Sequence, residues 1–203
     1  MLDENCYVVS DETLEAVIID CGAQLYEEQQ ALANYITLQK LKPVRLLCTH
    51  GHFDHNFGNA FIWKTYGLKP EVAAEDEGLM DIRRQMKTML GTDLPVEQAP
   101  TGRLLSADDV IEFGSHRLDI LPTPGHSRGS VTYYCEAEHV AFTGDTLFRL
   151  SIGRTDFEGG SWTEISHSLT QVLAKLPADT KVYPGHGEPT TIGEEVQYNP
   201  YMR

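Results

Sequence analysis

Apolar residues occur along the chain in short runs rich in β-branched side chains, separated by longer stretches in which they recur at helical spacing. Short runs of this kind predict β-strands. The predicted strands cover residues 16–20, 44–48, 110–113, 117–121, 131–135, 140–142 and 181–183. Strands interspersed with helices predict an α/β fold in which helices pack in layers against sheets.

The clearest helical pattern covers residues 161–176, where apolar side chains repeat along one face. Ser161 precedes the first turn and Glu164 follows three residues later, a pattern typical of a helix N-terminus. The apolar face of this helix predicts that the helix packs against a sheet. Weaker patterns predict helices over 27–41, 56–66 and 75–90, and residues 91–106, with two prolines and little periodicity, predict a long loop.

Length and charge narrow the class of protein. The 203 residues suffice for a single domain with a substantial core, and we expect one domain over residues 1–203. The formal net charge of −14 argues against a nucleic-acid partner or an anionic membrane, because either needs a basic surface. The chain shows neither a signal-peptide pattern nor an apolar stretch of transmembrane length. We therefore expect a cytoplasmic protein with no membrane partner.

The four cysteines, Cys6, Cys21, Cys48 and Cys135, lie far apart in or beside apolar runs and form no C-x-x-C pair. In a chain without a secretion signal, this spacing predicts buried, reduced thiols.

The strongest chemical signal is the segment 49–55, Thr-His-Gly-His-Phe-Asp-His, which directly follows the predicted strand 44–48. A strand end can present alternate side chains on one side, so His50 and His52 can reach one metal ion. The turn beyond them sends Asp54 and His55 toward a second ion. This spacing differs from the helical H-E-x-x-H arrangement.

Three further segments place a candidate ligand beside glycine at the end of a predicted strand. They are Thr-Pro-Gly-His ending at His126, Phe-Thr-Gly-Asp ending at Asp145, and Tyr-Pro-Gly-His ending at His186. Glycine permits a sharp turn and leaves space for an ion. Asp145 is the natural bridge, because one carboxylate can offer an oxygen to each of two ions. His116, His139 and His167 lack this context, and we interpret them as ordinary core or surface histidines.

These residues resemble those of the metallo-β-lactamase-fold hydrolases, in which H-x-H-x-D-H is followed by a single His, a bridging Asp and a final His. Short single-domain relatives of glyoxalase II (hydroxyacylglutathione hydrolase) are the most similar, through residues 123–127 (TPGHS), 144–148 (GDTLF), 151–156 (SIGRTD) and 199–200 (NP). The resemblance implies an αββα sandwich, in which two sheets are flanked by helices and the metals lie at one edge.

The resemblance implies that the protein binds two divalent metal ions. Zinc is the expected metal, with iron or manganese as alternatives. One ion would be held by His50, His52 and His126, and the other by Asp54, His55 and His186. Asp145 would bridge them. True β-lactamases of the superfamily are expected to be less similar, because they lack a bridging Asp.

Three departures from glyoxalase II concern its thiol substrate. The basic residue that contacts glutathione is retained as Arg154, but the aromatic residue two positions later is replaced by Asp156. The aromatic residue that follows the last His by two is replaced by Glu188. The C-terminal helical domain of the full-length enzyme has no counterpart here. Arg154 remains the predicted substrate-binding residue, and a glutathione thioester the candidate small-molecule substrate.

The implied reaction is hydrolysis. Two ions sharing a water would lower its pKa toward about 7, and Asp54 and Asp145 would hold the resulting metal-bound hydroxide for attack on a carbonyl. A thiolate can depart without a general acid, so a thioester or another activated ester fits best.

Two alternatives remain open. Persulfide dioxygenases share the fold and a similar 153–157 segment but use a single iron. The metals could instead only stabilise the fold of a non-catalytic module.

Overall fold

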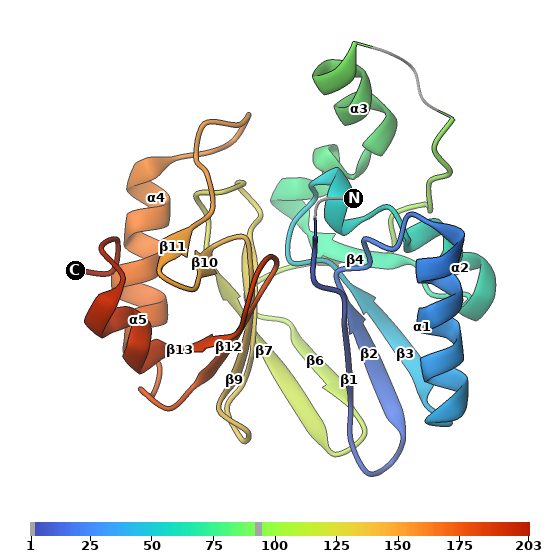
Figure 1. The fold of residues 1–203 in the computed structure, drawn as a ribbon, viewed down its shortest axis with the longest axis horizontal. Coiled ribbons are helices and arrows are strands. Elements are labelled where there is room, and N and C mark those ends of the chain that lie inside the picture. The colour runs from blue at the N-terminus through green and yellow to red at the C-terminus, as the bar shows by residue number, and fades with distance from the viewer. Residues whose placement is uncertain (1–2, 92–94) are drawn as a thin grey trace.

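The computed structural model describes residues 3–91 and 95–203. In this part of the chain, two β-sheets face each other at the centre of the molecule, and helices cover the outer face of each (Figure 1). The α/β sandwich expected from the sequence is therefore confirmed. Among the described residues, no helix combines the length and the apolar character needed to cross a membrane.

The first sheet comes from the N-terminal half of the chain. Its strands, in spatial order, are β1 (Tyr7–Ser10), β2 (Glu15–Ile19), β3 (Lys42–Leu47), β4 (Pro70–Ala73) and β5 (Leu104–Leu105). Strand β1 is antiparallel to β2, whereas β2 to β5 run parallel. Helices α1 (Tyr26–Leu38) and α2 (Asn59–Tyr66) lie on its outer side (Figure 1).

The second sheet comes from the C-terminal half. Its spatial order is β13 (Thr190–Thr191), β12 (Lys181–Pro184), β9 (Val140–Gly144), β8 (Val131–Cys135), β7 (His116–Pro122) and β6 (Val110–Phe113). Helices α4 (Trp162–His167) and α5 (Ile192–Tyr198) cover its outer face (Figure 1). A small ribbon, β10 (Leu147–Phe148) and β11 (Ser151–Ile152), lies near the same end as α4.

Alternation along β2 explains the layers. Val17 and Ile19 belong to the core between the sheets, whereas Ile18 packs with Ile36 of α1 and Ile62 of α2. Successive side chains of a strand point to opposite faces, and both faces of this strand are covered. This is why the strand reads as a continuous apolar run instead of alternating with polar residues.

The helix predicted over 161–176 is present but irregular. It begins at Trp162, where the Ser161 side chain accepts a hydrogen bond from the Glu164 amide, as the sequence indicated. A π turn at Ser168–Val172 and a 3₁₀ turn at Leu173–Lys175 then follow. Within the π turn, the Ser168 hydroxyl donates to the Pro124 carbonyl at 2.8 Å. The irregular turn thus supports the loop that carries His126.

The single helix predicted over 75–90 is wrong. A 3₁₀ helix, Ala74–Met80, is followed by the separate helix α3 (Ile82–Leu90). At Asp81 the backbone leaves helical geometry, with φ −80° and ψ 83°, and its carboxylate accepts a hydrogen bond from the Arg84 amide. Aspartate stabilises a helix N-terminus better than a helix interior, so it divides the segment in two.

The long loop predicted over 91–106 is only partly correct. Leu104–Leu105 form β5, and residues 95–103 have no regular secondary structure. Residues 92–94 of this prediction lie outside the described part of the chain.

Candidate metal centre

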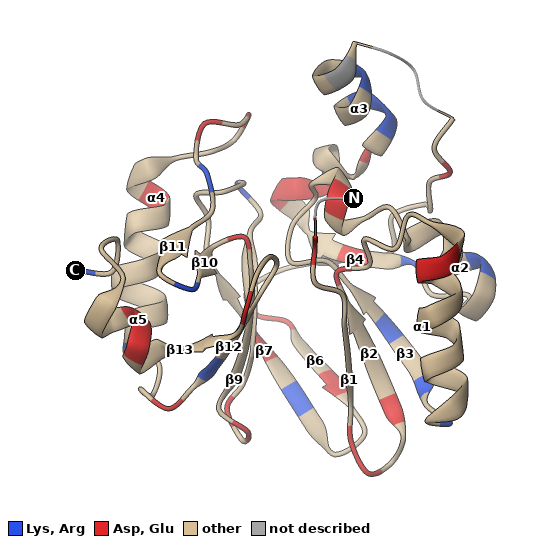
Figure 2. Cartoon of the chain, in the orientation of Figure 1, with Lys and Arg blue, Asp and Glu red and all other residues tan. Residues whose placement is uncertain are grey.

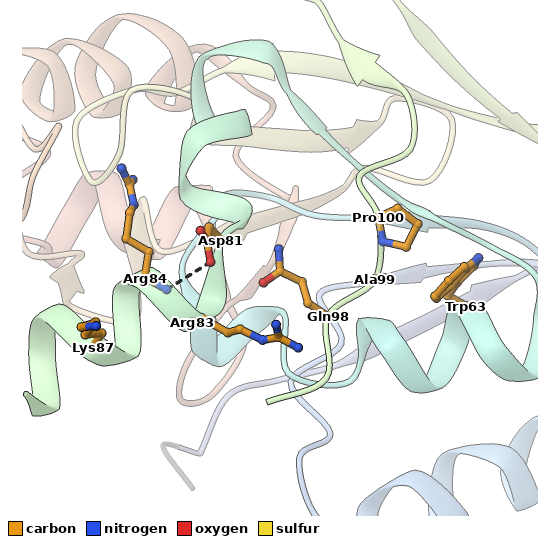
Figure 3. A pocket seen from close by; sticks show the side chains of 8 residues that line it. All are labelled: Trp63, Asp81, Arg83, Arg84, Lys87, Gln98, Ala99 and Pro100. Atoms are coloured by element: carbon orange, nitrogen blue, oxygen red, sulfur yellow. Dashed lines mark hydrogen bonds between the residues drawn. The ribbon is translucent and has the colours of Figure 1, made fainter. Parts of the chain in front are cut away.

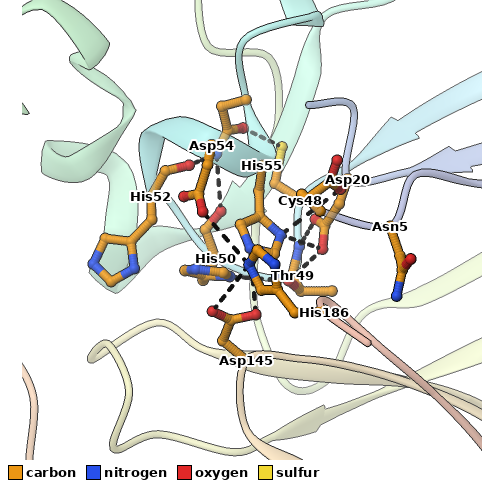
Figure 4. Close-up of polar contacts among 12 residues, drawn as sticks. Asn5, Asp20, Cys48, Thr49, His50, His52, Asp54, His55, Asp145 and His186 are labelled. Atoms are coloured by element: carbon orange, nitrogen blue, oxygen red, sulfur yellow. Dashed lines mark hydrogen bonds and ion pairs between the residues drawn. The ribbon is translucent and has the colours of Figure 1, made fainter. Parts of the chain in front are cut away.

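Strand direction brings the candidate ligands to one edge of the sandwich. Strands β7 and β9 are both antiparallel to β8, and β12 is parallel to β9, so all three end at the same edge of the second sheet. Their following loops carry His126, Asp145 and His186. The loop after β3 of the first sheet carries the other four candidates, and Figure 4 shows most of the set converging.

The first group contains His50, His52 and His126, whose ligand atoms all lie within 4.8 Å of one another. Nδ1 of His52 lies 2.8 Å from Nε2 of His126. Nε2 of His50 is buried and has no hydrogen-bond partner. These three residues match the set predicted for one ion.

The second group contains Asp54, His55 and His186, which meet the same 4.8 Å criterion. Oδ2 of Asp54 lies 3.5 Å from Nε2 of His186. His55 follows Asp54 in a 3₁₀ turn, Phe53–His55, and its side chain is fully buried. These residues match the set predicted for the second ion.

Asp145 lies between the two groups. Its Oδ1 is 3.3 Å from Nε2 of His55, and its Oδ2 is 3.5 Å from Nε2 of His126 and 3.6 Å from Nε2 of His186. One carboxylate therefore faces donors of both groups, which is the arrangement expected of a bridge.

Hydrogen bonds to the rest of the protein determine which nitrogen of each imidazole faces the centre. Nδ1 of His55 donates to Asp20 at 3.0 Å, and Nδ1 of His126 donates to the Arg154 carbonyl at 2.8 Å. Nδ1 of His50 lies 3.1 Å from the Thr49 hydroxyl. In all three rings Nε2 is left as the electron-pair donor, an arrangement typical of metal-binding histidines.

The buried atoms without partners test whether the residues fit metal ions. Nε2 of His50, Nε2 of His55 and Oδ1 of Asp145 are buried and make no hydrogen bond. Buried polar atoms rarely remain unpaired in folded proteins, because the loss of hydration is costly. Three such atoms in one cluster of nitrogen and oxygen donors fit divalent cations well.

The pKa values of two of the histidines, His50 and His52, support the same conclusion. Burial and the neighbouring His126 lower the pKa of His52 to about 4. Burial also lowers the pKa of His50 well below its usual value. Both rings are therefore neutral at physiological pH, which is the form that binds metal.

Asp145 differs from these histidines in that its surroundings favour the charged form. Burial raises the pKa of Asp145, but the neighbouring histidines, His55 above all, outweigh this effect and lower the value to about 2. The carboxylate is ionised and available to cations.

Glycine leaves the room that this cluster needs. A Cβ atom at Gly185 would lie 2.3 Å from Oδ1 of Asp145 and 2.6 Å from Cε1 of His55. Both distances are shorter than van der Waals contact, so the glycine before His186 permits the close approach.

Sequence reasoning missed Asp20, which is fully buried at the end of β2. Its carboxylate accepts hydrogen bonds from the Thr49 amide and hydroxyl, both at 2.7 Å, as well as from His55. The available signal was a charged residue directly after the apolar run Ala16 to Ile19, where burial would demand a partner.

Sequence reasoning also missed Asp76, which is buried in the 3₁₀ helix Ala74–Met80. Its carboxylate accepts hydrogen bonds from the Gly51 amide at 2.9 Å, the Ser127 hydroxyl at 2.6 Å and the Gly129 amide at 2.7 Å. It thereby joins the loop of His50 and His52 to the loop of His126. Nothing in the local pattern distinguished it from a surface residue of a helix.

A cavity of about 590 Å³ opens over the cluster. Its walls are largely apolar, and its ionisable lining includes Arg84 of α3 and the predicted substrate-binding residue Arg154. The Arg154 guanidinium forms two hydrogen bonds with Asp156, both at 2.7 Å. Arg154 thus lies where the sequence placed it, with an acidic partner.

The three histidines interpreted as ordinary lie outside the proposed centre, and the prediction of buried thiols holds for every cysteine except Cys6, which is partly exposed. His116 and His139 pair with surface acids, Asp11 and Asp179 respectively, at 3.4 and 3.0 Å, away from the cluster. His167 lies on α4. All four cysteines are free, and three are buried.

Comparison with known proteins agrees with this geometry. The model of the metallo-β-lactamase superfamily matches residues 2–186. An uncharacterized protein of Mycobacterium leprae is 36% identical, covering 100% of this chain and 94% of its own. A hydroxyacylglutathione hydrolase of Haemophilus influenzae is 30% identical over 98% of this chain and 92% of its own.

Solved structures give the same picture. The B3 metallo-β-lactamase BLEG-1 is 34% identical with a TM-score of 0.90, covering 99% of this chain and 95% of its own. TTHA1623, solved in a di-iron-bound form, is 32% identical with a TM-score of 0.84, covering 98% and 96%. ETHE1 from Myxococcus xanthus is 26% identical with a TM-score of 0.80, covering 99% and 80%.

The similarity to a protein described as a β-lactamase is greater than Asp145 led us to expect. All of these comparisons nevertheless agree with the fold. The chain belongs to the metallo-β-lactamase superfamily of metallo-hydrolases.

Proposed function

We propose that this protein is a dinuclear metal-dependent hydrolase of thioesters, similar to glyoxalase II. The observation that carries the proposal is the position of Asp145 between two groups of donors, with three buried atoms left without partners. His50, His52 and His126 would hold one ion, and Asp54, His55 and His186 the other. When bound, the ions supply an activated water at neutral pH and polarise the carbonyl of the substrate.

The protein's own residues position these ions and shape the space above them. Asp20 orients His55, and the Arg154 carbonyl orients His126. Phe53, Phe148 and Phe157 are among the apolar residues lining the cavity. Such walls exclude bulk water from the substrate and strengthen electrostatic interactions within the site.

The leaving group supports a thioester. The described lining of the cavity contains no lysine, tyrosine or cysteine that could protonate an amine. A thiol has a pKa of about 8.5 and departs as a thiolate without a general acid. The similarity to the hydroxyacylglutathione hydrolase of Haemophilus influenzae supports the same substrate class.

Two other activities are favoured by specific observations. The similarity to BLEG-1 favours β-lactam hydrolysis as one alternative activity. The similarity to ETHE1 from Myxococcus xanthus favours the other alternative, an oxygenase that uses one iron, as in persulfide dioxygenases. In such an enzyme His55 and His186 would have no ligand role.

One experiment separates these functions. Freshly purified protein is analysed for metals, and its turnover is measured with S-lactoylglutathione, a cephalosporin, and glutathione persulfide in an oxygen electrode. We expect close to two metals per chain and hydrolysis of the thioester. A ceiling of one iron per chain with oxygen uptake would contradict the proposal, as would turnover of the β-lactam alone.

A further inference from the structure

Two arginines line the cavity above the metal centre, and they differ in how their charge is used. Arg154 follows β11, whereas Arg84 lies on α3. Both side chains can reach a substrate in the cavity. Their neighbours indicate which of the two guanidinium groups already has a carboxylate partner and which can bind an anionic group of the substrate.

Arg154 is already engaged. Its Nε and Nη2 bond the two carboxylate oxygens of Asp156, and its guanidinium lies 3.9 Å above the ring of Phe157. A two-point contact of this kind matches the planar guanidinium to the carboxylate. An incoming anion would have to compete with Asp156 for the same donors.

Arg84 has no such partner. Its Nη2 donates to the carbonyl of Gly78 at 2.9 Å, and it forms no ion pair with any acid in the described residues. Arg84 is exposed, and most of its donors remain available. It is the cation of the cavity whose charge is not neutralised by a neighbouring carboxylate.

Helix α3 is fixed relative to the metal centre. Gln85, the next residue, donates from Nε2 to the Gly51 carbonyl at 2.9 Å, between His50 and His52. Gln85, Thr88 and Met89 line the cavity together with Arg84. Arg84 is therefore held at a defined place beside the proposed ligands, although its own side chain is exposed.

The same helix is basic within an acidic protein. Residues 82–90 contain Arg83, Arg84 and Lys87 and no acid, whereas the whole chain carries a formal charge of −14 (Figure 2). A local excess of positive charge attracts anionic ligands in solution.

A second hollow of about 670 Å³ lies beside α3 and shares Arg84 with the cavity. Its lining includes Arg83, Lys87, Trp63 and Gln98, together with one acid, Asp81. Figure 3 shows the Arg83 side chain extending toward Gln98, whereas Arg84 extends away from it. Arg84 therefore lines both spaces, whereas Arg83 lines the second hollow and not the cavity over the metal centre.

We propose that Arg84 binds a carboxylate or phosphate on the thiol part of the substrate, and that the hollow beside Arg83 receives the remainder of a long anionic thiol. The inference rests on the proposed thioester hydrolysis. Together the two spaces offer far more room than a short acyl group needs, so the larger thiol part is assigned to them. The thiol part of the substrate would carry several negative charges. These charges come either from carboxylates or from phosphates, and kinetics can distinguish the two.

Kinetics with one acyl group on three thiols test the proposal. S-acetylglutathione supplies carboxylates, acetyl-coenzyme A supplies phosphates, and S-acetyl-N-acetylcysteamine is uncharged. We expect Arg84→Gln to lower kcat/KM about tenfold or more for both anionic thioesters and less than about twofold for the neutral one. Arg83→Gln should lower kcat/KM for acetyl-coenzyme A, whose phosphate arm is long enough to reach the hollow, and an unchanged value for that substrate would contradict the assignment of the hollow.

A matched variant provides the control. Arg117→Gln removes an exposed arginine near the start of β7, which pairs with Asp119. It should leave the preference for anionic thioesters unchanged. An equal loss on charged and neutral substrates with Arg84→Gln, or the same selective loss with Arg117→Gln, would overturn the assignment.

Binding separates this inference from the proposed function. S-methylglutathione carries the same carboxylates and cannot be hydrolysed as a thioester, so its affinity is measured by titration calorimetry. Weaker binding to Arg84→Gln than to the unmodified protein and Arg117→Gln supports the role of Arg84 even if no thioester is turned over. Equal affinities for all three proteins would overturn it, whereas a lack of turnover of every thioester would count only against the proposed function.

Discussion

Each histidine of the proposed centre presents one nitrogen to the metals, and a hydrogen bond at the other nitrogen holds several of these rings in place. For His55 that partner is Asp20, which also accepts two hydrogen bonds from Thr49. Partners of this kind orient the ring and increase the basicity of the ligand nitrogen. A side chain that contacts no metal, such as Asp20, can therefore support metal binding through the ligand that it orients.

Asp20→Asn should weaken zinc affinity by about 10- to 100-fold, because the amide offers His55 a weaker acceptor or a competing donor. Affinity is measured by competition with a chromophoric chelator. The control is Asp179→Asn, which alters a similar contact with the exposed His139 at 3.0 Å. Unchanged zinc affinity in Asp20→Asn would show that the contact with His55 does not support a ligand.

Asp145→Ala should lose most hydrolysis while keeping a cooperative thermal transition, since the residue links two groups of donors from a loop. The bound metal should also fall below two per chain. Turnover, metal content and the melting curve are measured on the same preparation. Turnover close to that of the unmodified protein would show that Asp145 is not the bridge.

Sequence reasoning found the seven clustered residues but not their supports. The ligand candidates share a visible signal, because histidine or aspartate beside glycine at a strand end is unusual. Asp20 was detectable in principle as a charge at the end of an apolar run. Asp76 was not, because its role depends on Gly51 and Gly129, which are distant in sequence and meet it only in the folded protein.

At the scale of elements, the strands with strong apolar runs were predicted within a few residues. The missed strands are β1, β4, β5, β10, β11 and β13, which are short and depend for their pairing on neighbouring strands. The helix predicted over 75–90 failed at Asp81, whose capping hydrogen bond outweighs the helical pattern on either side. The break separates two segments with different roles. The 3₁₀ part carries Asp76, which joins two ligand loops, and α3 carries Arg84, which lines the cavity.

Asp76→Ala should destabilise the fold by roughly 3 kcal/mol, because two buried amides and a hydroxyl would lose their acceptor. Urea unfolding followed by circular dichroism measures the free energy of unfolding. Asp109→Ala is the control, since Asp109 likewise accepts from a backbone amide and a hydroxyl, both of Ser106, but at the surface. Equal destabilisation by the two substitutions would contradict a special role for Asp76.

At the scale of the molecule, the two sheets each contribute donors to one centre, and the core between them is apolar. The pattern of the chain predicted layers of helices and sheets but not this topology. The arrangement of two facing sheets came from the resemblance to a known family, because pairing order is fixed by contacts between distant strands.

Removal of metal should lower the melting temperature by roughly 5–10 °C, because ions bound only by the folded state stabilise it, by about 2.7 kcal/mol at a hundredfold excess over Kd. Differential scanning calorimetry is performed before and after chelation and after zinc is restored. The Asp145→Ala variant should show a smaller change. A melting temperature independent of metal in the unmodified protein would contradict a centre shared between the sheets.

The distribution of the proposed ligands along the chain sets an order for biosynthesis. The loop after β3 supplies four donors early in translation, whereas Asp145 and His186 are synthesised much later and take their places only when β12 has paired with β9. A nascent chain therefore displays an incomplete cluster without its bridge. All seven proposed ligands exist in one chain only after synthesis has passed His186, so the full proposed set would be available to a pair of ions only from that point on.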